Sequence, residues 1–199
     1  MQETLEYNIG ICGIGGQGNI VAARVLANAA MNQGINVKIG ELYGSAQRGG
    51  AVISHVRLGE VFAPLIPRGR ANALISLEQG EVLRYAHLLM PKATVLVNNY
   101  QIAPTSVKIG KATYPETETI KSTLAPITDN VKFVNATEQA LDLGNSRVAN
   151  IIMIGALAGT TKLPMPDAEI EGAIKAYFPP KNVDINFDAF HRGKELGQS

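Results

Sequence analysis

Three glycines near the N-terminus have the spacing of a loop that holds a phosphate group. Gly13, Gly15 and Gly18 follow an apolar run, residues 7–12, and a long helical pattern begins directly after them. A side chain at these glycines would block the tight turn between strand and helix and keep the backbone away from a ligand. Backbone N–H groups at the start of the helix could then face an anion. The alternative is a turn whose glycines serve only the close packing of helix on strand.

A second polar loop, residues 44–50, carries groups that could bind the same ligand. Gly49 and Gly50 leave this loop free to adapt, and the Arg48 guanidinium can hold a carboxylate or phosphate through paired hydrogen bonds. Ser45 and Gln47 can hydrogen-bond a neutral part of that ligand. The alternative is that Arg48 ties the two loops together through backbone carbonyls.

Glu41 stands at the end of the second expected strand. A dinucleotide-binding fold holds there the acid that binds a ribose hydroxyl, so a literal interpretation is an NAD site. The loop after Tyr43 argues against it, because such folds usually pass directly into a helix at this point. Both interpretations use one set of candidate cofactor-binding residues: Gly13, Gly15, Gly16, Gln17, Gly18, Glu41, Ser45, Gln47, Arg48, Gly49 and Gly50.

The order of strand and helix patterns predicts an α/β fold of the Rossmann-like, three-layer type, with a mostly parallel sheet, one antiparallel strand and a helical C-terminal quarter. The expected strands cover residues 7–13, 36–41, 51–58, 73–77, 93–98 and 131–135. The expected helices cover residues 16–33, 80–90, 117–124, 137–143, 148–157 and 167–177, with a helix or extended arm from 183. Gly34 should end the first helix, Gly144 the fourth, and Ser146 should cap the helix over 148–157.

The segment between the second and third strands is too short for a parallel crossover, so the third strand should return antiparallel. A right-handed crossover through the first helix should leave the first two strands parallel, with their carboxyl ends at one edge. Ligands bind at that edge in open α/β sheets, and there the two glycine loops should meet. Residues 60–70, with two prolines, should form a loop or surface arm.

Composition narrows the function classes. The 199 residues suit one domain over 1–199, and 46% hydrophobic against 18% charged residues is ordinary for a globular protein. A net charge of +1 gives no electrostatic footprint for nucleic acid or an anionic membrane. The N-terminus lacks the pattern of a secretion signal, and the most apolar run, 151–158, is far shorter than the ~20 residues of a membrane span. A cytoplasmic protein is therefore expected.

Few residues suggest catalysis. The one cysteine, Cys12, excludes an internal disulfide, a thiolate zinc site and a self-contained iron–sulfur cluster, and its place in the first strand favours a core role. His55 and Arg57 share a face of the third strand, where a histidine is more often hydrogen-bonded than catalytic. No catalytic residue is assigned, and the helix over 148–157, apolar all round, is either a central packing helix or a face for a partner subunit.

The chain resembles the small subunit of 2-oxoacid:ferredoxin oxidoreductases, and within that family the beta subunit of indolepyruvate ferredoxin oxidoreductase. The resemblance rests on the paired glycine loops and covers nearly the whole chain, through residues 13–18, 41–57, 64–67, 83–85, 97–98, 150–156 and 186–190. Asn72 departs from it, because an acidic residue is expected there, but Asn72 lies outside both loops.

The resemblance implies a reaction and assigns different roles in it to this chain and to a larger subunit. The reaction is oxidative decarboxylation of an aryl pyruvate to an aryl-acetyl-CoA, with reduction of ferredoxin. Thiamine diphosphate and [4Fe-4S] clusters would lie on a larger subunit, through which ferredoxin is reached, in agreement with the single cysteine. This chain, inactive alone and with no cofactor assigned to it, would complete the active-site cleft, and its two loops could cradle coenzyme A or the substrate. The alternatives are a stand-alone NAD(P)-dependent oxidoreductase that uses Glu41 and a pure scaffold subunit; isolated, the chain could also form a homodimer.

Overall fold

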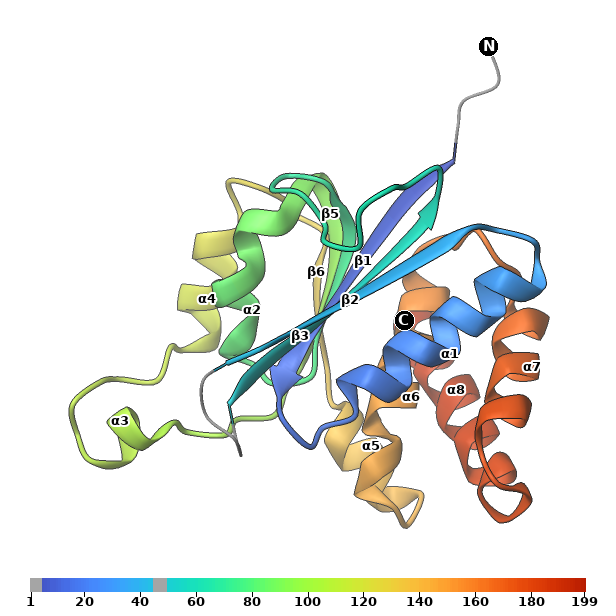
Figure 1. Ribbon diagram of the computed structural model, residues 1–199. Coiled ribbons are helices and arrows are strands. Elements are labelled where there is room, and N and C mark those ends of the chain that lie inside the picture. Colours follow the sequence, from blue (N-terminus) through green and yellow to red (C-terminus); the bar gives the residue numbers. More distant parts are fainter. Residues whose placement is uncertain (1–4, 45–49) are drawn as a thin grey trace.

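The computed structural model describes residues 5–44 and 50–199, which form a six-stranded mixed sheet with helices on both faces (Figure 1). The strand order is β2-β3-β1-β4-β5-β6. Strands β4, β5 and β6 continue parallel from β1, whereas β3 is antiparallel to both of its neighbours. The predicted α/β fold is confirmed. The strands are β1 (Glu6–Ile14), β2 (Val37–Tyr43), β3 (Ala51–Gly59), β4 (Ala71–Ser76), β5 (Leu89–Asn98) and β6 (Val131–Val134).

The antiparallel return of β3 is confirmed, and it places β3 between β1 and β2. Strand β3 pairs with β1 from Glu6 opposite Gly59 to Ile14 opposite Ala51. Its other edge pairs with β2, so β2 runs in the direction of β1, as predicted, without being its neighbour. The carboxyl ends of β1 and β2 lie at the same edge of the sheet.

One face of the sheet is covered by the helix after β1 and by the C-terminal helices (Figure 1). Helix α1 buries Ala22, Val25, Leu26 and Ala29, as its apolar periodicity predicts, and Gly34 follows its end with a φ of 71°. The helices on this side are α1 (Asn19–Asn32), α5 (Ala136–Asp142), α6 (Ala149–Thr160), α7 (Asp167–Tyr177) and α8 (Val183–Gln198), with 3-10 turns at η2 (Ser146–Val148) and η3 (Pro180–Asn182).

Helix α6 is the centre of this layer. Its residues from Asn150 to Leu157 are all buried, which identifies it as a central packing helix of this chain. It lies against α8 with the two backbones in contact, because glycines stand at the crossing. A Cβ on Gly155 would lie 2.0 Å from the Phe190 carbonyl oxygen, and one on Gly193 would lie 2.0 Å from that of Ile152.

The opposite face carries α2 (Glu81–Tyr85), η1 (Ala86–Leu88) and α4 (Thr117–Leu124), and a short α3 (Thr105–Lys108) lies in the segment before α4. Helix α4 has its predicted bounds. The helix predicted over 80–90 is too long, because Leu89 and Met90 already belong to β5. Pro91 disfavours the helical conformation at the residue before it, which explains the early end.

The cap predicted at Ser146 is also wrong. The Asn145 side chain instead accepts a hydrogen bond from the Arg147 N–H, and Ser146 begins the 3-10 turn η2 that leads into α6. In residues 60–70 the structure contains neither helix nor strand, as predicted. Within the described ranges, none of the helices is long and apolar enough to cross a membrane.

Candidate functional site

The glycine turn joins β1 to α1 at the carboxyl edge of the sheet. Gly16 and Gly18 have φ values of 104° and 86°, in the left-handed region that favours glycine. The Gln17 N–H donates to the Ile14 carbonyl oxygen at 3.1 Å, which closes the turn. Gly18 is the N-cap of α1, so the first N–H groups of this helix point out of its end without intrahelical partners. The turn geometry therefore suits an anion.

Gln17 holds this turn from within. Its side-chain oxygen accepts from the Ile14 N–H at 2.7 Å, and its side-chain nitrogen donates to the Leu77 carbonyl at 2.9 Å. A Cβ on Gly13 would lie 2.6 Å from that oxygen and 3.0 Å from the Leu77 Cβ. Gly13 is thus required by packing, and the hydrogen-bonding groups of Gln17 are engaged by the backbone.

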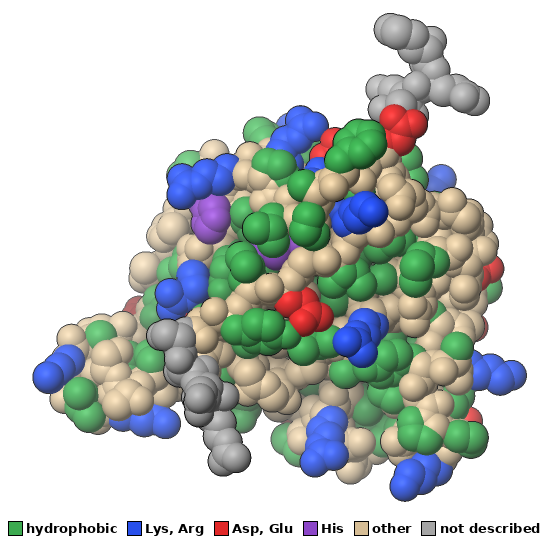
Figure 2. Space-filling view, viewed as in Figure 1, with side chains coloured by type: hydrophobic (Ala, Val, Ile, Leu, Met, Phe, Trp, Pro, Cys, Tyr) green, Lys and Arg blue, Asp and Glu red, His purple; other side chains and the backbone are tan. Residues whose placement is uncertain are grey.

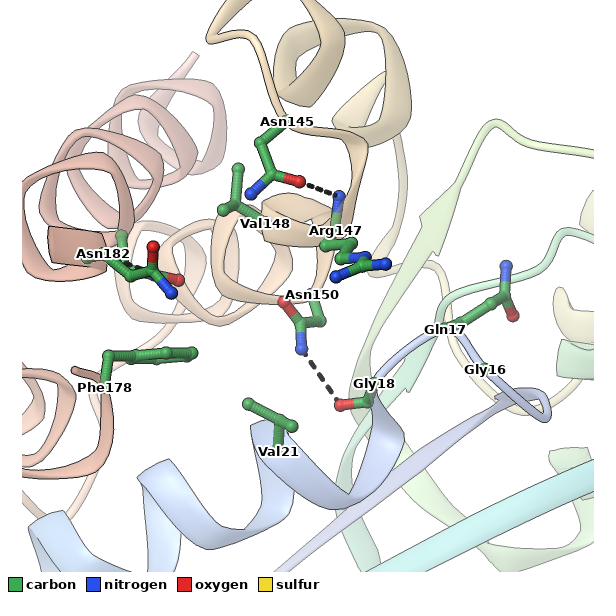
Figure 3. Close-up of a pocket in the computed structure, with 11 residues that line it drawn as sticks. Gly16, Gln17, Gly18, Val21, Asn145, Arg147, Val148, Asn150, Phe178 and Asn182 are labelled. Carbon is green, nitrogen blue, oxygen red and sulfur yellow. Dashed lines mark hydrogen bonds between the residues drawn. The ribbon is translucent and has the colours of Figure 1, made fainter.

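A cavity of about 330 Å³ opens beside the turn, where the starts of three helices converge (Figure 3). Its walls come from the glycine turn and the first turn of α1, from η2 and the start of α6, and from the end of α7 and the start of α8. The N-terminal ends of α1, α6 and α8 favour an anion here, whereas the C-terminal end of α7 at Phe178 carries the opposite partial charge. The lining residues are Gly16, Gln17, Gly18, Val21, Asn145, Arg147, Val148, Asn150, Phe178, Asn182 and Asn186.

Amide side chains dominate the polar lining. Asn150 is 4% exposed and donates from Nδ2 to the Gly18 carbonyl at 3.0 Å, across the space between α6 and α1 (Figure 3). Asn186 donates to the Asn182 carbonyl at 2.7 Å. The Phe178 ring forms an apolar wall, and Arg147 adds a full positive charge. Such a lining can take an anionic group joined to a neutral group that forms hydrogen bonds.

The second loop meets the glycine turn at its end. The Gly15 N–H donates to the Gly50 carbonyl at 2.9 Å, and the Gly44 N–H donates to the Ala51 carbonyl at 2.7 Å. Both loops therefore start and end at one edge of the sheet. The remaining candidates of this loop, Ser45, Gln47, Arg48 and Gly49, lie outside the described residues, so their ligand contacts stay predictions.

Glu41 lies apart from the glycine turn. It sits on β2 opposite Ser54 of β3, and Ser54 in turn faces Ile11 of β1. Two strand spacings, about 10 Å, separate Glu41 from β1. The Glu41 carboxylate also accepts a hydrogen bond from the Tyr43 hydroxyl, which raises the pKa of Tyr43. In a dinucleotide-binding fold, the strand that carries the ribose-binding acid lies next to the first strand. Here β3 separates β2 from β1, so Glu41 is not placed to bind a ribose held at the glycine turn.

A second cavity, of about 530 Å³, lies at the same edge under residues 102–115. The buried Glu78 carboxylate accepts from the Gly80 and Glu81 N–H groups and, at 2.9 Å, from the Ile102 N–H. It also accepts from the Tyr114 hydroxyl at 2.5 Å, and burial together with this carboxylate raises the pKa of Tyr114. Glu78 therefore fixes this segment to the start of α2.

The remaining candidates have structural contacts. Cys12 is buried, contacts the Ser76 hydroxyl at 3.2 Å, and has a pKa raised to about 12 by burial, so it is a core residue. Arg57 donates to the Ala63 carbonyl and His55 accepts from the Ile66 N–H, so both residues hold the 60–66 segment. Across the described ranges, no group of three or more His, Cys, Asp or Glu side chains could hold a metal ion.

The far wall of the cavity was not predicted as a site. Its residues come from 145–150 and 178–186, more than 120 positions beyond the glycine turn. The one signal in the sequence is Asn150, an amide within an otherwise apolar helix pattern. Packing of α6 and α8 against α1 brings this wall to the turn.

Comparisons with known proteins cover nearly the whole chain and agree on its family. Residues 8–196 match the family model described as pyruvate ferredoxin/flavodoxin oxidoreductase. The indolepyruvate oxidoreductase subunit IorB of Archaeoglobus fulgidus is 41% identical over 189 residues, which are 95% of this chain and 94% of that protein. Pyruvate oxidoreductase subunit PORC from Thermotoga maritima superimposes with a TM-score of 0.72 at 25% identity, over 96% of both chains.

A third comparison shows the fold inside a longer chain. The 2-oxoglutarate:ferredoxin oxidoreductase from Magnetococcus marinus, solved with 2-oxoglutarate, coenzyme A and succinyl-CoA bound, superimposes with a TM-score of 0.71 at 17% identity. The match covers 97% of the present chain and 31% of that chain. At this identity the likeness is one of fold.

Proposed function

The chain belongs to the pyruvate ferredoxin/flavodoxin oxidoreductase family as a small subunit of a 2-oxoacid:ferredoxin oxidoreductase, and we propose that its enzyme acts on indolepyruvate or a similar aryl pyruvate. The observation that carries the substrate class is the 41% identity to an indolepyruvate oxidoreductase subunit over almost the full length of both chains. The proposed reaction is oxidative decarboxylation to the aryl-acetyl-CoA, with electrons passed to ferredoxin.

The chemistry of decarboxylation and electron transfer is assigned to the larger subunit. An iron–sulfur cluster needs about four thiolates, whereas this chain has one cysteine, buried and in contact with Ser76. The donor set of this chain does not fit a cluster. We therefore place thiamine diphosphate and the [4Fe-4S] clusters on the larger subunit, and this chain completes the cleft beside them.

The cavity at the glycine turn fits the nucleotide end of coenzyme A. Helix N-termini and the Arg147 guanidinium suit phosphate groups, while Asn150 and the Phe178 ring suit a base. Coenzyme A supplies the thiol that accepts the acyl group; the residues of this chain bind and orient its remote end. The predicted contacts from Ser45, Gln47, Arg48 and Gly49 belong to the same proposal.

The substrate assignment is tested with the assembled enzyme. The chain is co-purified with its larger subunit, and ferredoxin reduction is measured with indolepyruvate, phenylpyruvate, pyruvate and 2-oxoglutarate. We expect the highest kcat/KM with an aryl pyruvate. A preference for pyruvate or 2-oxoglutarate would overturn the substrate class and leave the family unchanged.

Coenzyme A binding is tested by replacing the cavity cation. Arg147→Ala should raise the KM for coenzyme A roughly ten-fold with kcat retained, because a charge-assisted contact to phosphate is removed. Arg48→Ala tests the second loop in the same way. Arg192→Ala is the control, since Arg192 lies on α8 with its guanidinium bonded to Gln139. An unchanged KM for coenzyme A in both Arg147→Ala and Arg48→Ala would refute the proposal that coenzyme A binds at this site.

The alternative of a stand-alone NAD(P)-dependent oxidoreductase is disfavoured by the position of Glu41. Titration of the isolated chain with NADH, followed by calorimetry, is expected to give no binding. A pure scaffold role is distinguished by the coenzyme A experiment, because a scaffold would show normal KM values in both arginine variants.

A further inference from the structure

An apolar patch wraps around the edge strand β2 and the segment that follows β3. It consists of Ile39, Leu42 and Tyr43 on β2 and of Phe62 and Leu65 on the segment 60–66, here called the arm. Phe62 is 94% exposed and Tyr43 60% exposed. Figure 2 shows hydrophobic side chains on this face of the molecule, with Lys and Arg side chains around them and an acidic side chain among them. Successive side chains of a strand point to opposite faces, so Ile39 and Tyr43 lie on one side of β2 and Leu42 on the other, and the patch covers both sides of this edge strand. Exposed apolar side chains gathered on one edge in this way mark an interaction site.

The arm is held by a buried arginine. The Arg57 guanidinium donates to the Ala63 carbonyl at 2.8 Å and to the Leu65 carbonyl at 3.3 Å. Its other nitrogens donate to Asn8 at 2.8 Å and to the Glu6 carboxylate at 3.2 Å. A guanidinium with all these partners fixes the backbone on both sides of residue 64. The exposure of Phe62 is therefore not a result of a loose segment.

The far end of the arm is fixed to β2 and β3. The Ile66 N–H donates to His55 Nδ1 at 3.2 Å, beneath the arm. A Cβ on Gly40 would lie 2.9 Å from Leu65 Cδ2 and 3.1 Å from the Pro64 carbonyl oxygen, so the arm rests directly on the backbone of β2. The patch is a preorganised surface, which lowers the entropy cost of docking a partner.

The size of the patch suits one side of a protein interface. From their exposed fractions, the five side chains expose roughly 400–700 Å² of mainly apolar area, taking about 150–250 Å² for a fully exposed side chain of this size. A standard interface buries about 800 Å² on each partner. Phe62 has the character of an anchor, because buried aromatic side chains carry much of the energy of such interfaces.

The rim of the patch identifies the partner. Exposed cations surround it: Lys38 on β2, Arg68 after the arm, and Arg24 on α1, whose charge acts on Tyr43. Within the part of the chain that the structure describes, none of the three forms an ion pair. The carboxylates here are Glu60, which is exposed, and Glu41 on β2, which accepts a hydrogen bond from the Tyr43 hydroxyl. The cations outnumber these two carboxylates, so the rim is basic on balance. A second copy on a two-fold axis would bring the same basic rims face to face. A different protein with an acidic rim fits better.

We propose that the arm and β2 dock into an apolar pocket, rimmed by acidic residues, on the larger subunit of the oxidoreductase, with Phe62 as the anchor. This inference rests on the proposed function, since the larger subunit is the partner that function requires. The patch ends at Tyr43, where β2 reaches the edge that carries the glycine turn. The docked subunit therefore extends toward the candidate site.

The test measures assembly of the full chain with its larger subunit. Binding of purified wild-type chain is followed by calorimetry at low and moderate salt, and Phe62→Ala is compared with Leu141→Ala. Leu141 is the matched control, because it is 61% exposed on α5 and lies outside the patch. We expect Phe62→Ala to weaken binding roughly 10- to 30-fold and Leu141→Ala to leave it unchanged. Lys38→Glu should weaken binding and reduce its dependence on salt.

The outcomes separate this proposal from the proposed function. Wild-type binding that is unaffected by Phe62→Ala, with circular dichroism showing a folded variant, would overturn the docking surface and leave the function intact. A wild-type chain that does not bind the larger subunit would overturn both. A homodimer of the isolated chain that Phe62→Ala abolishes would assign the patch to a second copy and refute the heterologous partner.

Discussion

Stability should fall between neutral and mildly acidic pH because of His55. This ring is 3% exposed, accepts the Ile66 N–H at Nδ1, and has a buried Nε2 without a hydrogen-bond partner in the described residues. Burial, and then the charges of Arg57 and His87, lower its pKa from 6.5 to about 4. In the folded chain His55 is therefore neutral throughout the range in which an unfolded chain takes up a proton.

The sign and the size of the change in the free energy of unfolding follow from proton linkage. Between pH 6.5 and 4 the unfolded state binds the proton and the folded state does not, so unfolding becomes easier as the pH falls. The loss of unfolding free energy begins near pH 6.5 and is complete near pH 4. It amounts to about 1.4 kcal/mol for each unit by which folding lowers the pKa of His55. At pH 5 it amounts to about 2 kcal/mol relative to neutral pH.

The assay is urea unfolding at pH 7, 6 and 5, followed by circular dichroism, for the wild type and for His55→Asn. An asparagine oxygen can still accept the Ile66 N–H but does not titrate. The variant is expected to be less stable at pH 7, because ring packing is lost, yet to lose about 2 kcal/mol less on going to pH 5. Parallel pH profiles for the two proteins would refute the reasoning, whatever their absolute stabilities.

Three further substitutions test contacts near the site and in the helical layer. Gly18→Ala should destabilise the chain by about 2 kcal/mol or more in urea unfolding, because residue 18 has a φ of 86° and a Cβ would lie 2.4 Å from Asn150 Nδ2; an unchanged midpoint would contradict this. Gly193→Ala should cost about 3 kcal/mol or more, since the added carbon meets the Ile152 backbone and α8 must move away from α6; Gly172→Ala, with open space around it, is the control. Tyr114→Phe should lower stability by about 1–3 kcal/mol and speed hydrogen exchange in residues 100–116, because a buried carboxylate loses a donor; exchange that changes uniformly along the chain would argue against a local role.

Much of the fold could be predicted because local signals and tertiary packing agree. The turn after β1 needs left-handed residues, and glycines stand at both of them, Gly16 and Gly18. The short link between β2 and β3 leaves an antiparallel return as the natural connection, which the structure has. Helix α4 was predicted at its bounds. In each case the residues that determine the turn, the connection or the helix bounds lie close together in the sequence.

The errors arise where two local patterns compete. Residues 80–90 show a helical apolar period, but the sheet takes the last two of them, and Pro91 sets the change. At the start of α6, Asn145 and Ser146 are both good caps, and the 3-10 turn favours the first. The apolar period alone does not decide between these choices.

The sequence predicted one wall of the candidate site and not the other. The glycine turn was found, whereas Asn150, which bonds to it from 132 residues away, was assigned no role. The insertion of β3 next to β1 also moved Glu41 out of the place that a dinucleotide fold would give it. Pairing between distant strands and packing between distant helices decide both points, and neither leaves a short-range signal.

The burial of the apolar stretch of α6 affects how the complex can assemble. Residues 150–157 of this helix are all buried within its own polypeptide, so this apolar stretch needs no partner protein to cover it. We therefore expect the chain to fold to its native structure first and to bind its partner subunit afterwards, as an already folded protein. For this chain, assembly would then be the encounter of an already folded protein with its partner, with a rate set by diffusion and charge and not by its own folding.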